Sequence, residues 1–352
     1  MPDIAAILRT AVEKNATDIH LQAGVPAMYR INKRLAPVGS ERLSAEDIEQ
    51  MLFGMMTEAQ RKILRERMDC DFSYGVSGLA RFRVNVFHQR DSLAAAMRLI
   101  AFQIPPLETL GVPPAVVELT RLRRGFVLVT GSAGNGKSTT LAALIDRMNQ
   151  ERALHIVTLE DPIEYLFQHR SSIVVQREIG TDAITFEGAL RAALREDPDV
   201  ILVGEMRDLQ TIEAALTAAE TGHLVFATLH TKTPAQGIDR MVDVFPSHQQ
   251  RQIQMLLANV LHGILTQQLL VRKEGDGLVL ACELLIATPA VRNMIREGKT
   301  FQIQTMLQTG TASGMITMEQ SLRGLVERGL ITYDDALDHA FDPRELERLI
   351  GR

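Results

Sequence analysis

The stretch from residue 131 to residue 138 has the residue types and spacing to bind phosphate. It reads Gly-Ser-Ala-Gly-Asn-Gly-Lys-Ser and fits G-x-x-x-x-G-K-[ST], the phosphate-binding loop (P-loop) of nucleoside triphosphatases. The alternative is a chance glycine-rich turn, which the fit to this eight-residue motif and to its flanks makes the weaker interpretation. The residues expected to hold the nucleotide are Gly131, Ser132, Ala133, Gly134, Asn135, Gly136, Lys137, Ser138 and Thr139.

The flanks of this loop match the context that the motif requires. An apolar run at 126–129 predicts a buried parallel strand before it, and apolar residues at helical spacing predict a helix from 139 to 148 after it. A helix N-terminus of this kind directs backbone N–H groups at an anion. Lys137 would add charge near the β and γ phosphates, and the Ser138 hydroxyl could ligate Mg²⁺.

Two acidic clusters follow at the ends of apolar runs, where open α/β sheets bind their ligands. Glu160 would orient or deprotonate the attacking water; the alternative is a solvated acidic turn. In the second cluster Gly204 takes the place of the usual metal-binding Asp, so Glu205 would supply the carboxylate that holds Mg²⁺. There the alternative is a strand end with surface charges.

Two histidines bracket the apolar run 224–229, and an arginine pair lies far upstream. His230, at the carboxyl end of the run, is expected to sense the γ-phosphate, whereas His223 is as well explained by a structural hydrogen bond. Arg81 and Arg83 flank Phe82 in an alternating pattern, so they share one exposed strand face. They could neutralise transition-state charge, although from sequence alone a solvated strand face is the better explanation.

Composition is that of an ordinary globular protein with a sizeable core. The chain has 352 residues, 46% of them hydrophobic and 23% charged, and a net charge of −5. This charge gives no global attraction to nucleic acid or to acidic membranes. The two cysteines are far apart, which suits reduced thiols in a cytosolic protein. We expect no membrane span and no signal peptide.

Two domains are expected, joined by a linker at 103–114 that contains two Pro-Pro pairs. Residues 1–102 predict a small α+β domain, with helices near 3–15, 44–56 and 57–67 and strands at 18–22, 27–32 and 79–89. Residues 115–352 predict an α/β domain with a largely parallel sheet covered on both faces. Its expected strands are 126–130, 154–159, 173–175, 200–204 and 224–229; its expected helices are 137–149, 185–196, 208–221 and 248–267, followed by a helical region from about 285.

Together these clusters resemble the secretion and pilus motor ATPases. Residues 158–164 (Thr-Leu-Glu-Asp-Pro-Ile-Glu) are similar to that family's aspartate box, 204–208 to its atypical Walker B motif, and 221–231 to its histidine box. Residues 290–299 and 16–21 resemble the C-terminal and N-terminal motifs of its pilus-retraction branch. Two cysteines cannot form the four-cysteine zinc module of the assembly branch, so the retraction branch is the better match.

The resemblance implies a PAS-like N-terminal domain, a RecA-like ATPase domain and a ring of six subunits. ATP and Mg²⁺ would be bound between the domains, and Arg81, Arg83 and also Arg98 would reach the nucleotide. It further implies a motor that drives type IV pilus retraction and twitching motility. The motor would be cytoplasmic, at the inner face of the cytoplasmic membrane, and its partners would be the inner-membrane pilus platform protein and other retraction subunits. Nucleic acid and direct membrane contact are not expected.

Departures from the family pattern keep alternatives open. Ser132, Ala133 and Asn135 replace the family's Pro, Thr and Ser in the loop, and Lys33 replaces a turn glycine. These changes suggest a divergent paralogue, such as an accessory or low-turnover retraction motor. A pilus-assembly or type II secretion motor, a nucleic-acid translocase and a nucleotide-switched binding module without turnover are the other functions to be weighed.

Overall fold

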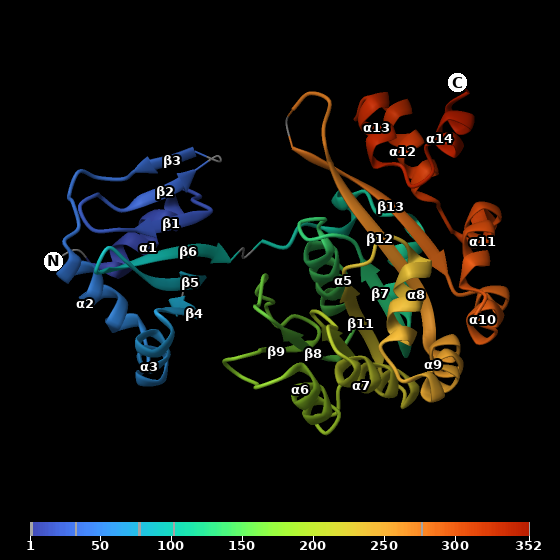
Figure 1. The fold of residues 1–352 in the computed structure, drawn as a ribbon, viewed down its shortest axis with the longest axis horizontal. Helices are drawn as coiled ribbons and strands as arrows, with labels where there is room; N and C mark the ends of the chain where they lie inside the picture. The colour runs from blue at the N-terminus through green and yellow to red at the C-terminus, as the bar shows by residue number, and fades with distance from the viewer. Residues whose placement is uncertain (1–2, 32–33, 77–78, 101–102, 276, 352) are drawn as a thin grey trace. The chain divides into compact units, whose positions relative to one another are not determined.

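The computed structural model describes residues 3–31, 34–76, 79–100, 103–275 and 277–351, so the turn expected to be altered at Lys33 lies outside the described residues. The chain forms two compact units (Figure 1). One contains residues 1–103 and 162–166, and the other contains residues 104–161 and 167–352. Within the described ranges, no helix has the length and apolar character needed to cross a membrane.

The N-terminal unit is an antiparallel six-stranded sheet with helices packed on one face. Its strands, in the sheet order β3-β2-β1-β6-β5-β4, are β3 (Arg34–Pro37), β2 (Met28–Ile31), β1 (Asp18–Leu21), β6 (Ser92–Ile100), β5 (Ala80–Gln89) and β4 (Asp69–Val76). Its helices are α1 (Ile4–Glu13), α2 (Ala45–Met55) and α3 (Glu58–Arg67). Ser44 and Thr57 begin α2 and α3 with capping boxes, as the sequence predicts. Sequence analysis missed β3, β4 and β6.

The second unit is built on a seven-stranded sheet in the order β13-β12-β7-β11-β10-β8-β9, parallel except for the β12–β13 pair. Its strands are β7 (Gly125–Thr130), β8 (His155–Glu160), β9 (Ile173–Glu178), β10 (Val200–Val203), β11 (Leu224–Leu229), β12 (Leu261–Val271) and β13 (Leu278–Ile286). The helices between them are α4 (Pro114–Glu118), α5 (Lys137–Glu151), α6 (Phe186–Ala193), α7 (Leu209–Glu220), α8 (Pro234–Asp243) and α9 (Ser247–Val260). Short 3₁₀ turns, η1 (Leu107–Leu110) and η2 (Leu119–Arg121), flank α4.

Continuous apolar strands fit this sheet because both of its faces are buried. Along β7, Phe126 and Leu128 belong to the core on one face, shared with α6 to α11, whereas Val127 and Val129 belong to the core shared with α5. The expected mostly parallel, two-sided sheet is therefore confirmed.

The helix expected at 248–267 is wrong in its second half. α9 ends at Val260, and the chain continues directly as β12, which pairs with β7 on one side and β13 on the other. Residues 261–271 carry apolar side chains on both faces with a few polar ones between them, so their pattern fits a buried helix and a central strand equally. The long-range pairing partners decide between them, and the same pairing creates β13, which the sequence analysis did not predict.

The chain ends in helices, as expected: α10 (Pro289–Arg296), α11 (Ile303–Thr309), α12 (Met318–Glu327), α13 (Tyr333–His339) and α14 (Pro343–Ile350), with 3₁₀ turns η3 (Thr300–Gln302) and η4 (Gly310–Ser313). Under α12, Glu283 of β13 is fully buried beside Glu319. Burial is the main reason why the pKa of Glu283 is raised to about 7, and the Glu319 carboxylate adds to it. Glu319 itself accepts hydrogen bonds from the N–H groups of Phe341 and Asp342.

Glu283→Gln should stabilise the protein at neutral and alkaline pH. The unfolded carboxyl ionises near pH 4.5 and the folded one near 7, so the wild-type free energy of unfolding falls as pH rises through that window. Glutamine keeps an acceptor for the Met318 N–H without this penalty. Melting temperatures should be higher for the variant at pH 8, with a smaller difference at pH 5.

A matched control is Glu327→Gln, which removes a surface carboxylate from α12 that pairs with Arg323. Its melting temperature should follow that of the wild type at both pH values, because exposed ion pairs contribute little. A Glu283→Gln protein that melts below the wild type at pH 8 would mean that the buried carboxylate is ionised and stabilising.

Candidate active site

Strand order brings the predicted groups together at one edge of the sheet. The P-loop follows β7, His230 follows β11, Glu205 follows β10 and Glu160 ends β8, and these four strands are neighbours in that order. Because they are parallel, their carboxyl ends lie side by side. Residues separated in sequence by up to about a hundred positions therefore lie next to one another along this edge of the sheet.

Close backbone packing and β12 shape the P-loop. Gly131 has a φ of +140°, and a side chain there would meet the Gln267 carbonyl oxygen at 2.5 Å. The Asn135 Oδ1 atom accepts a hydrogen bond from the Leu269 N–H at 3.3 Å. Asn135 replaces the family's Ser, so this departure gives the loop a side-chain anchor on β12.

Lys137 is 8% exposed and lies at one end of a chain of polar contacts. Its Nζ atom donates to the carbonyl oxygens of Gly131 (2.8 Å) and Ser132 (3.0 Å) and lies 3.4 Å from the His230 Nδ1 atom. The other ring nitrogen of His230 lies 3.1 Å from Glu205 Oε1. His230 thus connects the P-loop lysine to the acidic cluster.

Glu205 is bound on both of its oxygens. Its second oxygen accepts a 2.8 Å hydrogen bond from Arg207, whose other terminal nitrogen lies 3.8 Å from Asp161. Burial by itself would raise the pKa of Glu205. The hydrogen bond and charge of Arg207, with a smaller contribution from His230, more than offset it, and the net pKa is lowered. The carboxylate therefore stays ionised at neutral pH, as a metal-binding group must. Sequence analysis missed this role of Arg207.

Glu160 is held by polar neighbours next to Gly204. Its Oε1 atom accepts hydrogen bonds from the Thr158 hydroxyl (2.6 Å) and the Gln176 amide (3.2 Å). At Gly204, a side chain would come within 3.1 Å of the Leu159 carbonyl oxygen and 3.3 Å of the Glu160 Cα atom. A residue larger than glycine would therefore fit here only if the end of β8 moved by a few tenths of an ångström.

His223 and the arginine pair lie elsewhere. His223 precedes β11 at the strand end opposite His230, and its Nδ1 atom is 2.9 Å from the Ala218 carbonyl oxygen, which is a structural contact. Arg81 and Arg83 lie on β5 of the N-terminal unit, where Phe82 is fully buried between them. The alternation is as the sequence predicts, and their part in catalysis stays a prediction.

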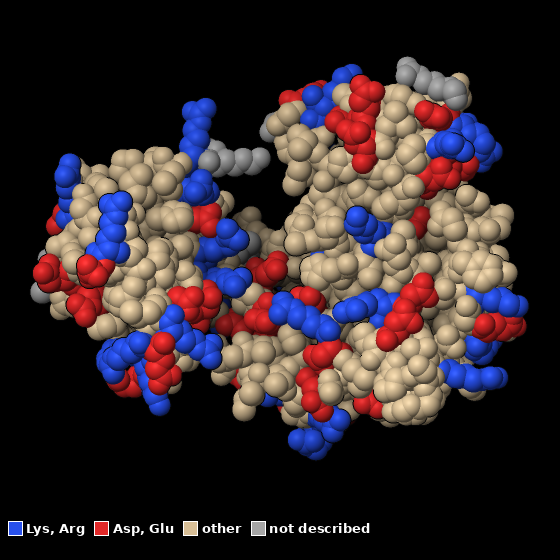
Figure 2. All heavy atoms as spheres, viewed as in Figure 1, with Lys and Arg blue, Asp and Glu red and all other residues tan. Residues whose placement is uncertain are grey.

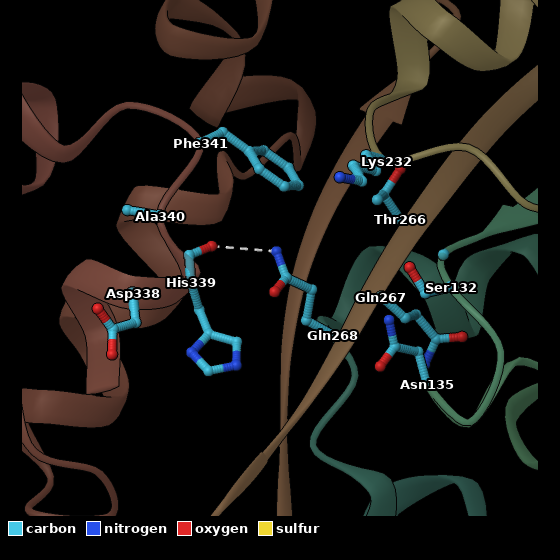
Figure 3. Close-up of a pocket in the computed structure, with 11 residues that line it drawn as sticks. Ser132, Asn135, Lys232, Thr266, Gln267, Gln268, Asp338, His339, Ala340 and Phe341 are labelled. Atoms are coloured by element: carbon cyan, nitrogen blue, oxygen red, sulfur yellow. Dashed lines mark hydrogen bonds between the residues drawn. The ribbon is translucent and has the colours of Figure 1, made fainter. Parts of the chain in front are cut away.

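A cavity of about 320 Å³ adjoins the P-loop (Figure 3). Its walls come from the loop, from β12 and from the α13–α14 connection, where the Gln268 amide donates to the His339 carbonyl at 3.1 Å. The side chains that line it include Ser132, Asn135, Lys232, Gln268, His339 and Phe341. The end of α13 and the residues after it thus line the cavity beside the loop that sequence analysis singled out.

Ser138, at the start of α5, and Glu205, after β10, are the residues that would hold Mg²⁺. One hydroxyl and one carboxylate suit this cation, since Mg²⁺ usually keeps several waters and binds nucleotide phosphates rather than an all-protein cage. The lowered pKa of Glu205 favours the charged form that this role needs.

A P-loop at the switch between parallel strands, with carboxylates and a histidine on the adjoining strand ends, defines a RecA-like P-loop ATPase. The family model described as "Type II/IV secretion system protein" matches residues 1–328. The chain belongs to this family.

Close relatives are known. The chain is 45% identical to the type IV pilus retraction ATPase PilT of Pseudomonas aeruginosa, over 97% of this chain and 99% of that protein. It is 46% identical to a twitching motility protein of Neisseria gonorrhoeae, over 95% and 89%. A crystal structure of the pilus retraction motor PilT with bound ADP superposes with a TM-score of 0.92 at 50% identity, covering 99% of this chain and 100% of that one.

Gly204→Ala should slow ATP hydrolysis more than it weakens nucleotide binding. The new methyl group would push the Glu160 backbone by a few tenths of an ångström, and displacements near reacting groups cost rate steeply, here about tenfold in kcat. The control is Gly324→Ala in α12, where a side chain meets nothing within 4 Å. Steady-state phosphate release would measure kcat for both variants. An unchanged kcat in Gly204→Ala would show that Glu160 tolerates the shift.

Proposed function

We propose that this protein is an ATP-hydrolysing motor that drives type IV pilus retraction and twitching motility. The observation that carries the proposal is the line of P-loop, His230, Glu205 and Glu160 on adjacent strand ends. The similarity to proteins named for pilus retraction and twitching motility extends over nearly the full chain, and it supports the pilus as the structure on which the motor acts.

In this mechanism, each side chain acts where the structure holds it. ATP binds to the P-loop with Lys137 at its phosphates, for phosphate oxygens are stronger acceptors than the two carbonyls that Lys137 contacts. Glu160 aligns and deprotonates the attacking water, and His230 reports the γ-phosphate to Glu205 through the contact between them. Mg²⁺, held through Ser138 and Glu205, would neutralise phosphate charge.

The motor would act as a homo-hexameric ring in the cytoplasm, at the inner face of the membrane. Residues 103–114 would form the hinge between the two domains 1–102 and 115–352, and ATP would drive closure because it binds the closed arrangement better. Its partner would be the inner-membrane pilus platform protein, through which it would act on the pilus. On the face that Figure 2 shows, acidic and basic side chains are interspersed, which does not favour a nucleic-acid translocase.

Among the arginines of the N-terminal unit, Arg83 is the best placed to act on a nucleotide. Cross-strand pairing sets Arg30, Asp18, Arg98 and Arg83 in one row across β2, β1, β6 and β5. Asp18 pairs with Arg98 at 2.9 Å and with Arg30 at 3.6 Å. Arg83 is exposed and forms no ion pair within the described part of the chain. Its charge is therefore available to a phosphate held by another subunit. Arg81, two residues earlier on the same strand, is half-buried.

Arg83→Ala should lower ATP turnover by about a thousandfold or more, the range of an arginine that stabilises transition-state charge. Arg98→Ala is the matched control on the adjacent strand and should cost less than about threefold, because Asp18 already neutralises it. Phosphate release by the assembled protein is the measurement. Equal losses in the two variants would refute the choice of Arg83.

The pilus function is tested by deleting the gene in its native host and complementing it with the wild type or with Glu160→Gln. Deletion should leave cells over-piliated and unable to twitch, and only the wild type should restore motility. Purified Glu160→Gln should lose at least about tenfold in kcat (~1.4 kcal/mol); a smaller loss would remove Glu160 from catalysis. Bald cells after deletion would instead identify an assembly motor. Near-normal motility would identify an accessory retraction paralogue, which the altered P-loop residues favour as the second candidate.

A further inference from the structure

The segment 290–299, which resembles a retraction-motor motif, has an inner and an outer side on α10. Val291 and Ile295 are fully buried in the core that α10 shares with α9, whereas Asn293 and Arg296 are exposed. Arg292 belongs to neither side, because its side chain reaches back to the end of α9 and to the end of β13.

Arg292 satisfies carbonyl groups that the end of a helix leaves without partners. Its Nη1 atom donates to the carbonyl oxygens of Ala258 at 2.6 Å and Asn259 at 2.7 Å, both in the last turn of α9. Its Nε atom donates to the carbonyl oxygen of Ala287 at 3.0 Å. A positive charge is also favoured at this end of the helix dipole. Arg292 thus fixes the junction where α9 turns directly into β12.

The junction is tied to the start of the strand that carries the P-loop. The pairing of β12 with β7 has a register shift between Leu261 and Gly263, which leaves His262 as a bulge. The His262 ring is hydrogen-bonded to the backbone of Arg124 and packs on Gly125, where a side chain would overlap it at 2.2 Å. The first residues of β12 therefore set how β12 lies along β7.

Further along, β12 is bonded to the P-loop and its flanks by side chains. The Thr266 hydroxyl lies 2.7 Å from the Thr130 hydroxyl, directly before the loop. The Gln267 amide donates to Thr140 in the first turn of α5 at 2.9 Å. With the bond from the Leu269 N–H to Asn135, three contacts join the loop region to this one strand. A shift of β12 along β7 would disturb all three.

We propose that Arg292 is a positioning residue for the nucleotide site: by holding the α9–β12 junction it sets the register of β12, and through β12 the geometry of the P-loop. Sequence analysis used this segment only as a resemblance to the pilus-retraction branch. The structure instead separates Arg292, which acts on nucleotide binding, from Asn293 and Arg296, which face outward. The inference rests on nucleotide binding by the P-loop and does not depend on the pilus as the load.

The test measures binding of a fluorescent ADP analogue to the full chain, together with the KM for ATP. Arg292→Ala should raise the dissociation constant and the KM at least fivefold, measured well below the melting temperature of each variant. Arg292→Lys should stay within twofold of the wild type, because one nitrogen makes both bonds to α9 and a lysine ammonium can replace it. Arg296→Ala, one turn along the same helix, should also stay within twofold.

A second comparison separates positioning from simple destabilisation. Thr266→Val removes the hydroxyl contact to Thr130 with little change in volume. If Arg292 acts through β12, the double variant should weaken ADP binding by less than the product of the two single effects. Multiplicative effects would overturn the proposal. The proposal would also be overturned if the Arg292→Ala protein had a lower melting temperature than the wild type but bound ADP within twofold of it.

Should Arg292→Ala fail to fold, Arg292→Gln gives the same readout with a neutral side chain. A lowered melting temperature with wild-type ADP affinity in that variant would overturn the positioning role. Weak ADP binding by the unmodified protein would count against the proposed function, whereas tight binding that every Arg292 variant preserves would overturn the positioning role only.

Discussion

The parallel hydrogen-bonded ladder of β7, β11, β10 and β8 is the constraint on which the rest of the structure depends. Parallel strands place their carboxyl ends at one edge, so residues that follow different strands become neighbours there. This is how Lys137, His230 and Glu205 come to form one chain of contacts. The ladder can run through the centre of the unit because helices bury both of its faces, and its strands are accordingly apolar throughout.

Close packing limits what the site can contain. Gly204 leaves room for β10 to approach the end of β8, which brings Glu160 beside the backbone that carries Glu205. The carboxylate proposed to hold Mg²⁺, that of Glu205, therefore follows the glycine by one position. Gly131 lets the P-loop approach β12 in the same way, because a side chain there would meet the Gln267 carbonyl oxygen.

Many arginines of this chain are bonded to carboxylates or to backbone carbonyl groups, and this bears on which of them could contact a phosphate. Asp18 holds Arg98 and Arg30 on the open face of the N-terminal sheet, and Glu205 holds Arg207 at the edge of the other sheet. Arg292 is taken up by backbone carbonyls. Each pairing gives a cation a partner within the chain, which is why Arg83 is the arginine proposed to meet a phosphate.

The sequence by itself determined the chemistry of this protein: the P-loop, the acidic and histidine clusters, and the apolar runs that become β7, β8, β10 and β11. These signals are local, because each is written in consecutive residues. Only the tertiary structure decided that 261–271 is a strand, that Arg207 binds Glu205, and that Arg292 closes the end of α9. Those outcomes depend on partners distant in the chain, and the same stretch of residues is compatible with more than one local conformation until its partners are in place.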